Sequence, residues 1–352
     1  MNAARTGILI ASATLALLAG CSTRRPTVTG PDTPRPEPTR SPIGVVLLED
    51  LVGRQIFPAS DAWNLDASQA PVDSSSQAYI DWIKQSAADH SIPVCRPQAY
   101  FGQPPFGVPY VVVSGSQPLQ PLTFLYGQGI YDAGAPGRPA GYPIPEEAKS
   151  QPGYIEGNVP GGGTYGDRHM IVVDRDHGLL FETWATRWDA SAAHWEVGGA
   201  ATFDLSKGGA HPEGTSSASA SGLAMLPGLV RYDEAQGSDP IRHALLCNVW
   251  ATNGHVWPAV HTTNSTAGAP PLGTRLRLKA SVDLSAYPPW IQRIFQAMKT
   301  YGLIITDNGG CELGVAGTMD PRWDNATISH SFGTLSADDF EVVQLGWGRP
   351  AP

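Results

Sequence analysis

A histidine and a glutamate in two adjacent predicted strands are the residues of this sequence best suited to proton transfer. His169 begins the run His169–Asp174, Glu182 lies in the run Leu179–Trp184, and the turn-forming segment Arg175–Gly178 joins the two runs. Alternate residues of a strand share a face, so this hairpin would bring His169 and Glu182 to one sheet surface. Apolar neighbours would raise the pKa of the Glu182 carboxyl, which suits a general acid. The alternative is a glutamate on a solvated sheet face.

Two further histidines lie where predicted strands meet loops. His243 begins an apolar strand-like run, and His261 follows the segment Trp257–Val260. Strand ends beside loops are common positions for functional groups. With His169 these residues could form an acid–base pair or a metal site, or each could be a hydrogen-bonded structural histidine. The cysteines lack zinc-site spacing, and we predict no metal and no cofactor.

Aromatic and basic side chains supply candidates for binding a ligand. The chain has ten Trp and eleven Tyr, and an aromatic face beside polar groups offers a sugar ring an apolar platform with hydrogen bonds. A stripe of cations on one strand, residues 275–279, could hold an anionic polysaccharide or pair with the chain's own acids. The substrate-binding candidates from these patterns are Asp167, Arg168, Trp184, His243, Trp257, Arg275, Lys279, Arg322 and Trp323, with Arg277 in the same stripe.

The spacing of apolar residues predicts a mainly β fold. The 39 Gly and 32 Pro exclude a helical bundle, and the chain shows many short strand-like runs bounded by turn residues. We expect a β-sandwich or jelly-roll-like domain with one or two packed helices, over residues 76–89 and 289–301, and long loops over 127–163 and 207–222. The predicted strands are 110–114, 122–126, 169–174, 179–184, 200–205, 243–250, 275–281, 303–306 and 340–345.

The N-terminus indicates export and lipid attachment. Residues 1–20 have the short apolar core of a signal peptide, and Leu18–Cys21 resembles a bacterial lipobox, which implies acylation of Cys21. Residues 21–42, the lipidated cysteine and a Pro/Thr-rich stretch, predict an extended tether, and residues 43–352 a single globular domain. We therefore expect a lipid-anchored, extracytoplasmic protein of the cell envelope that is a monomer. Of the remaining cysteines, Cys247 is predicted to be a buried thiol, and Cys95 with Cys311 could form a disulfide.

The charge of the chain restricts its partners. The formal net charge is −9. Residues 1–42 hold five arginines and two acidic residues, so residues 43–352 carry about −12. Such an acidic domain is not expected to bind nucleic acid, which needs a basic face.

Four segments resemble a family of bacterial secreted and lipoprotein sequences. They are Asp167–Asp176, Ser221–Glu234, Pro271–Ala280 and Tyr301–Gly309, and the resemblance runs from about residue 57 to residue 343. It implies one domain but carries no activity, fold or catalytic residue. Cys95, Cys311 and His177 depart from the family pattern, so the disulfide would be particular to this chain. The resemblance adds as candidates Arg231, Tyr232, Asp233, Glu234, Asp307 and Asn308.

The function that these features favour is hydrolysis of glycosidic bonds in a polysaccharide. Glu182 and one of two further acids would form the carboxyl pair that such chemistry requires. The alternatives are a non-catalytic lipoprotein that binds glycan or cell wall, and a polysaccharide lyase in which the basic stripe neutralises a uronate. A histidine-ligated metalloenzyme is a further alternative. The catalytic candidates are Glu182, Glu234, Asp307, His169 and His261.

Overall fold

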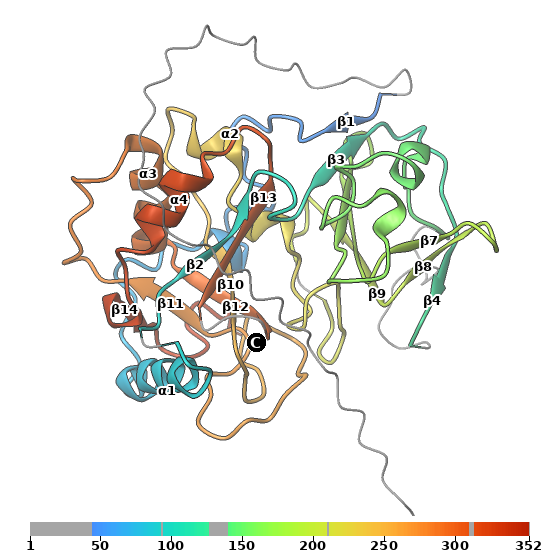
Figure 1. Ribbon diagram of the computed structural model, residues 1–352. Coiled ribbons are helices and arrows are strands. Elements are labelled where there is room, and N and C mark those ends of the chain that lie inside the picture. Colours follow the sequence, from blue (N-terminus) through green and yellow to red (C-terminus); the bar gives the residue numbers. More distant parts are fainter. Residues whose placement is uncertain (1–43, 93, 127–139, 210, 310–312, 352) are drawn as a thin grey trace, which may run out of the picture. The chain divides into compact units, whose positions relative to one another are not determined.

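The computed structural model describes residues 44–92, 94–126, 140–209, 211–309 and 313–351 (Figure 1). They belong to one compact unit, residues 38–352. Cys21 and Cys311 lie outside the described residues, so the predicted lipid attachment and the predicted disulfide lie outside them as well. Within the described ranges, no helix is long and apolar enough to cross a membrane.

The prediction of a mainly β fold is confirmed. In the part of the chain that the structure describes, fourteen strands form three mixed sheets. The five-stranded sheet has the order β1-β3-β5-β6-β9. Its strands are β1 (Val46–Leu47), β3 (Tyr110–Val113), β5 (Met170–Asp174), β6 (Leu179–Trp184) and β9 (Gly199–Asp204).

The six-stranded sheet contains parallel and antiparallel pairs. Its order is β14-β11-β12-β10-β13-β2, with β10 parallel to β12. The three-stranded sheet has the order β4-β8-β7. The strands of the two sheets are β2 (Gln98–Gly102), β4 (Leu122–Phe124), β7 (Arg187–Asp189), β8 (His194–Val197), β10 (Leu245–Val249), β11 (Arg275–Leu278), β12 (Leu303–Asn308), β13 (Gly314–Met319) and β14 (Phe340–Val342).

The helices include both that the sequence predicts. Ile80 and Ile83 of α1, and Ile291 and Phe295 of α3, are buried against the six-stranded sheet, as the i, i+3, i+4 spacing indicates. The α-helices are α1 (Ser76–Asp89), α2 (Tyr232–Ala235), α3 (Pro289–Thr300) and α4 (Asn325–Phe332). Short 3₁₀ helices are η1 (Ala62–Asn64), η2 (Glu146–Lys149), η3 (Pro160–Gly162), η4 (Leu226–Gly228) and η5 (Ala337–Asp339).

The two larger sheets pack against each other through one apolar cluster. Ile171 and Leu180 of the five-stranded sheet share this cluster with Leu246 and Ile304 of the six-stranded sheet. Alternate residues of each strand supply it, which is the packing expected of a sandwich. The opposite face of the five-stranded sheet packs against Trp195 and the small sheet. Any polar side chain on the inner face of β5 or β6 is therefore desolvated.

Gly302 ends helix α3 in a conformation that needs glycine. Its φ is +80°, and its N–H donates to the carbonyl of Ala297 at 3.1 Å. A Cβ at this position would lie 2.4 Å from the carbonyl oxygen of Leu276 in β11. The glycine thus allows the close approach of the helix end to the six-stranded sheet.

We expect Gly302→Ala to destabilise the fold more than Gly254→Ala. Gly254 has a φ of +72° but no atom within 4 Å of a built Cβ, so its substitution costs only the backbone strain, about 1–2 kcal/mol. Gly302→Ala adds the clash with Leu276. Urea unfolding of both variants measures the difference, and equal losses of unfolding free energy would contradict the role of close packing.

Candidate functional site

The predicted hairpin is confirmed and carries the core of the candidate site. Strands β5 and β6 pair antiparallel, with Ile171 opposite Glu182. His169 directly precedes β5 on the face of Ile171, and it is 6% exposed. His169 and Glu182 therefore lie on the inner face of the five-stranded sheet, between the two sheets. The desolvated environment that the sequence predicts for Glu182 follows from this position.

The Glu182 carboxylate holds a backbone turn. Its oxygens accept hydrogen bonds from the N–H of Met225, at 2.8 and 2.9 Å, and from the N–H of Leu226, at 2.8 Å. The side chain is 0% exposed, and burial raises the pKa of Glu182 to about 7 although these amides favour the ionised form. A carboxyl enclosed in this way cannot touch a substrate, so we interpret Glu182 as a positioning group and not as the general acid.

Asp307 lies at the carboxyl end of β12, next to the parallel strand β10. Its Oδ1 accepts from the N–H of Asn308 at 2.8 Å, and its Oδ2 accepts from the N–H of Ala220 at 3.3 Å. Asp307 as a residue is partly exposed, whereas Glu182 is fully buried. Desolvation raises the pKa of Asp307 to about 6, and the nearby His169 opposes this rise. Asp307 is thus partly accessible to a ligand, and its raised pKa allows it to donate a proton at mildly acidic pH.

His169 is the centre of the candidate site. Its imidazole interacts electrostatically with Glu182, Asp307 and Glu156, and it moderates the rise that burial causes in the pKa of each carboxyl. Its backbone N–H donates to Oε2 of Glu156 at 3.2 Å. Among the described residues its buried Nδ1 has no hydrogen-bond partner. A buried ring nitrogen without a partner can exchange a proton with a ligand or a water.

An exposed carboxylate and two aromatic rings border this centre. Asp167 is exposed and raises the pKa of both Asp307 and Glu156 by its charge. Its Oδ1 accepts from the indole N–H of Trp184 at 3.3 Å. The Trp184 ring stacks on Tyr126, with centroids 5.9 Å apart and an interplanar angle of 25°. Tyr126 is 66% exposed, so the pair presents an aromatic face to solvent.

The segment 217–226 connects Glu182 to the other polar groups. Nδ1 of His261 lies 2.9 Å from the carbonyl oxygen of Ala220, the residue whose N–H contacts Asp307. The backbone N–H of His261 donates to the carbonyl of Ser221. The Ser219 and Ser221 hydroxyls lie 2.9 Å apart in the same buried segment. The structure thus brings His261 to the site through backbone contacts.

Asn308 lies beside this site in a network of its own. Its amide nitrogen donates to Oγ1 of Thr263 at 2.8 Å, and its Oδ1 accepts from Asn264 at 2.8 Å. These bonds join the end of β12 to the loop that contains residues 263 and 264. Asn308 is therefore bound to the chain and is a positioning group for the strand end.

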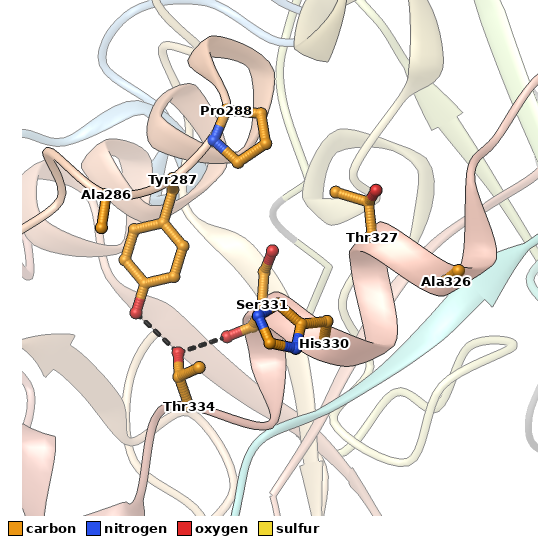
Figure 2. Close-up of a pocket in the computed structure, with 8 residues that line it drawn as sticks. All are labelled: Ala286, Tyr287, Pro288, Ala326, Thr327, His330, Ser331 and Thr334. Atoms are coloured by element: carbon orange, nitrogen blue, oxygen red, sulfur yellow. Dashed lines mark hydrogen bonds between the residues drawn. The ribbon is translucent and has the colours of Figure 1, made fainter. Parts of the chain in front are cut away.

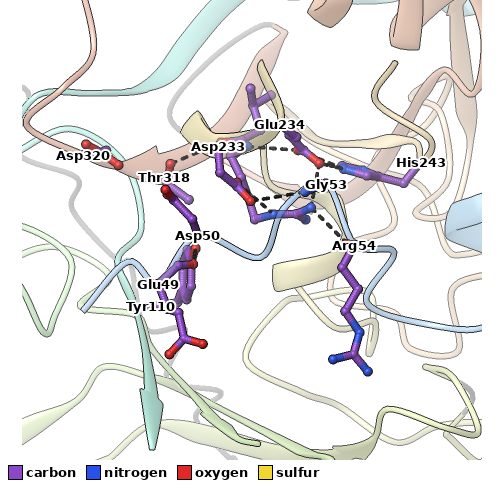
Figure 3. A network of polar contacts seen from close by, with 12 residues as sticks. Glu49, Asp50, Gly53, Arg54, Tyr110, Asp233, Glu234, His243, Thr318 and Asp320 are labelled. Carbon is purple, nitrogen blue, oxygen red and sulfur yellow. Dashed lines mark hydrogen bonds and ion pairs between the residues drawn. The ribbon is translucent and has the colours of Figure 1, made fainter. Parts of the chain in front are cut away.

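Glu234 lies in a second buried network (Figure 3). It accepts from Nη2 of Arg231 at 2.6 Å, and its oxygens lie 3.0 Å from Nε2 of His243. Opposite charges on Arg231 and His243 lower the pKa of Glu234 against the effect of burial. All three side chains are at most 4% exposed. This network ties α2 to the strand start at His243, and Glu234 is not free to act as a second catalytic carboxylate.

Tyr232, Arg322 and Trp323 pack beside the second network. The Arg322 guanidinium lies 4.3 Å from the centroid of the Tyr232 ring and binds Asp320 through Nε at 2.9 Å. Trp323 is 1% exposed and donates to the carbonyl of Thr318 at 2.9 Å. These predicted substrate-binding residues are part of the packed structure and lie apart from the contacts of His169.

The basic stripe on β11 is used within the chain. Arg275 and Arg277 are 5% and 8% exposed, and Arg277 binds Glu341 at 2.8 Å and the carbonyl of Ala70 at 3.0 Å. Arg275 donates to the carbonyl oxygens of Ala62 and Tyr301, and Lys279 donates to that of Asp338. Of the two alternatives for the stripe, the structure therefore favours pairing of the cations with oxygens of the chain itself.

Two other predicted binding residues have mainly local contacts. Arg168 has a φ of +53° and donates to the carbonyl of Gly166, so it shapes the turn before His169. Trp257 is partly buried, and its ring lies 3.3 Å from where a Cβ on Gly348 would be. It packs against the C-terminal segment.

A separate surface groove lies between the start of α3 and α4 (Figure 2). Its volume is about 470 Å³, and its rim includes Tyr287, whose hydroxyl lies 2.6 Å from that of Thr334. His330 is the only histidine among its eight lining residues, and none of the eight carries a carboxyl group. The groove therefore lacks the acid–base groups found around His169.

Three comparisons with known proteins gave no match: no family model, no curated protein and no solved structure is similar to this chain. The site is therefore interpreted from its own geometry. Sequence reasoning did not find Glu156 or Tyr126, since Glu156 lies in a Gly/Pro-rich stretch with no strand pattern and Tyr126 ends a short strand-like run. The signal that could have indicated Tyr126 is its aromatic ring directly after an apolar run.

The pKa of Glu182 predicts that the protein loses stability as pH rises. The folded state binds the Glu182 proton more tightly than the unfolded state does. The stability that this proton contributes is therefore fully present below pH 4.5 and is lost as pH rises through about 7. The loss is on the order of 3 kcal/mol. Glu182→Gln removes this titration, so the unfolding free energy of the variant relative to wild type should rise between pH 5 and pH 8. Urea unfolding at both pH values measures it.

Asp204→Asn is the matched control for that experiment. Hydrogen bonds from Ser206 lower the pKa of Asp204 to about 2, so the group is ionised at pH 5 and pH 8 in both states. Its effect on stability should be equal at the two pH values. A Glu182→Gln effect that is also equal at both would contradict the buried titration.

Proposed function

We propose that this protein hydrolyses glycosidic bonds, with Asp307 as general acid and Asp167 as the second carboxylate. The observation that carries the proposal is the pairing of unlike acids around His169. Asp307 is desolvated, with a pKa raised to about 6, and Asp167 is exposed at the surface and interacts with it electrostatically. Glycoside hydrolysis uses a carboxylic acid whose pKa is raised by burial together with a second carboxyl group nearby.

Each residue then has a role that follows from its position. Asp307 gives its proton to the leaving oxygen of the glycosidic bond. Asp167 stabilises the positive charge developing on the sugar, and a water molecule completes the hydrolysis by attacking the anomeric carbon and giving a proton to a carboxylate. His169 interacts electrostatically with Asp307 and opposes the rise that burial causes in its pKa, while Glu182 fixes the turn that positions Asp307 through Ala220. The pair differs from the one expected from the sequence, in which Glu182 would act with Glu234 or Asp307.

The aromatic surface supports a sugar as the ligand. The stacked Trp184 and Tyr126 rings lie next to Asp167, which binds the indole N–H. A sugar ring binds where an apolar platform and directional hydrogen bonds are adjacent. A ligand on Trp184 would thus be held beside the carboxyl pair.

The charge of the domain favours a neutral polysaccharide. Residues 43–352 carry about −12, and the cations of β11 are bound to the chain's own oxygens. An anionic polymer would be repelled by such a domain. A lyase that needs Arg275 or Lys279 to neutralise a uronate is disfavoured for the same reason.

The proposed setting is the outside of the cell envelope. The lipobox-like Leu18–Cys21 and the Pro/Thr-rich residues 22–42 support a lipid anchor followed by a tether. Detection of a lipidated N-terminal cysteine by mass spectrometry of the protein from its native membrane tests this part.

A second candidate function is glycan binding without catalysis. The Trp184–Tyr126 pair favours it, since stacked rings bind a sugar without any acid–base chemistry. The two candidates differ in what the wild-type protein does to a polysaccharide. A hydrolase releases products at a rate that depends on Asp307, whereas a binding protein releases none.

Asp307→Asn should reduce hydrolysis at least about 100-fold, the usual contribution of a general acid. The purified protein is incubated with a panel of neutral polysaccharides, and released ends are measured by mass spectrometry. Because Asp307 must be protonated to act, the wild-type rate should fall as pH rises through about 6. Asp283→Asn, an exposed loop aspartate that bonds only Ser285, is the control and should retain full activity. Absence of cleavage by wild type across the panel would refute hydrolysis.

Trp184→Ala should weaken binding of the same polysaccharide about tenfold, because it removes the stacking platform. Isothermal titration calorimetry with Asp307→Asn, which binds but does not cleave, isolates this effect. Trp250→Ala is the matched control, since Trp250 is 36% exposed and its ring packs at an angle of 42° against that of His90 instead. Equal affinity in the two tryptophan variants would place the sugar elsewhere.

A further inference from the structure

We propose that the β7–β8 hairpin binds one Zn²⁺ ion through Asp189, His194 and Glu196. The antiparallel register pairs Asp189 with His194, and Arg187 with Glu196. Alternation along the two strands places these four side chains on one face. This site is separate from the His169 site, and the proposal does not depend on the function proposed there.

The donor atoms have the spacing of ligands around one metal ion. One ligand atom from each of Asp189, His194 and Glu196 lies within 4.8 Å of the others. Nε2 of His194 and Oε1 of Glu196 are 3.4 Å apart. Two ligands of a tetrahedral zinc ion, at bond lengths near 2.1 Å, are separated by about 3.4 Å.

The three side chains each keep a donor atom available. Nε2 of His194 is buried and has no hydrogen-bond partner within the described ranges. Glu196 uses Oε2 for Arg187, whose Nε lies at 2.9 Å, and leaves Oε1 towards His194. Asp189 uses Oδ1 to accept from the N–H groups of Ser191, at 2.9 Å, and Ala192, at 3.1 Å. In each carboxylate one oxygen accepts hydrogen bonds from an outer partner, and the other accepts none among the described residues, although Oδ2 of Asp189 lies 3.8 Å from Nη2 of Arg187.

The opposite face of the hairpin makes the site rigid. Trp188 and Trp195 pair across the strands on that face, with ring centroids 5.4 Å apart. Trp195 is 1% exposed within the apolar cluster under the five-stranded sheet. Lys149 lies 4.0 Å over the Trp188 ring. A hairpin fixed by the buried Trp195 and the partly buried Trp188 holds its outward face in place before a metal arrives, which limits the entropy cost of binding.

The donor set selects the class of metal. One imidazole and two carboxylates suit zinc and related transition metals better than Ca²⁺ or Mg²⁺, which prefer all-oxygen sites. Arg187 lies 3.8 Å from Oδ2 of Asp189, so its positive charge weakens the attraction but leaves a net charge of about −1 with a neutral histidine. Three protein ligands leave the fourth zinc position to water.

The test is calorimetric titration of the chelator-treated, purified protein with ZnCl₂. We expect one site per chain, and no comparable binding of CaCl₂ or MgCl₂. His194→Ala should weaken zinc binding at least about 100-fold, since even outer partners of a metal site contribute 10- to 100-fold. Zinc should also raise the melting temperature of wild type but not of His194→Ala. Substitution by Co²⁺ should give the visible absorption of a tetrahedral ion.

His255→Ala is the matched control. His255 also faces a carboxylate, with its Nε2 2.5 Å from Oε1 of Glu213, but Glu213 and His255 have no third ligand among the described residues. This variant should bind zinc as wild type does. Asp189→Asn gives a second route if His194→Ala does not fold, and should weaken binding at least tenfold. Failure of wild type to bind one equivalent of zinc, or equal losses in the two histidine variants, would overturn the proposal.

Discussion

The contact between the Glu182 carboxylate and the backbone of Met225 and Leu226 is the constraint on which the candidate site depends. It joins the inner face of β6 to segment 217–226, and that segment contacts Asp307 through Ala220 and His261 through the same residue. A fully buried carboxyl group is costly unless it is hydrogen-bonded. The fully buried Glu182 therefore orients the backbone of segment 217–226, and the less buried Asp307 remains for the proposed chemistry.

The two buried acidic networks show how environment separates residues of one type. Glu182 accepts hydrogen bonds from backbone amides and interacts with His169 only through charge among the described residues, so burial dominates and its pKa rises to about 7. Glu234 has Arg231 and His243 in direct contact, so opposite charge dominates and its pKa falls. Removing one partner of such a pair would leave an uncompensated buried charge. The network of Glu234 consequently stabilises the position of α2. The Glu182 carboxyl instead gains or loses a proton near neutral pH.

Elements with a clear period of apolar residues could be predicted from the sequence, and so could the faces on which their residues lie. Strands β5 and β6 alternate cleanly, and α1 and α3 have apolar residues every third or fourth position, so their bounds and the common face of His169 and Glu182 followed. Strand β13, with two glycines in six residues, and the short β7 and β8 have no such pattern. The approach of Asp307 to His169 depends on packing between sheets, which local sequence does not encode. The same limit explains why the sequence could not choose between Glu234 and Asp307 as the partner of Glu182.

The position of the β7–β8 hairpin gives the proposed zinc site a consequence for the proposed glycan site. The N–H of Gly198, directly after β8, donates to the carbonyl of Trp184 at 2.7 Å. A Cβ on Gly198 would lie 2.5 Å from the Trp184 ring, so the hairpin end and the indole are in close contact. An ion that fixes His194 and Glu196 of β8 therefore restrains the strand that supports the aromatic platform. Binding of metal at one face of the hairpin would reduce the motion of the indole, and so the entropy that a sugar ring loses on stacking there.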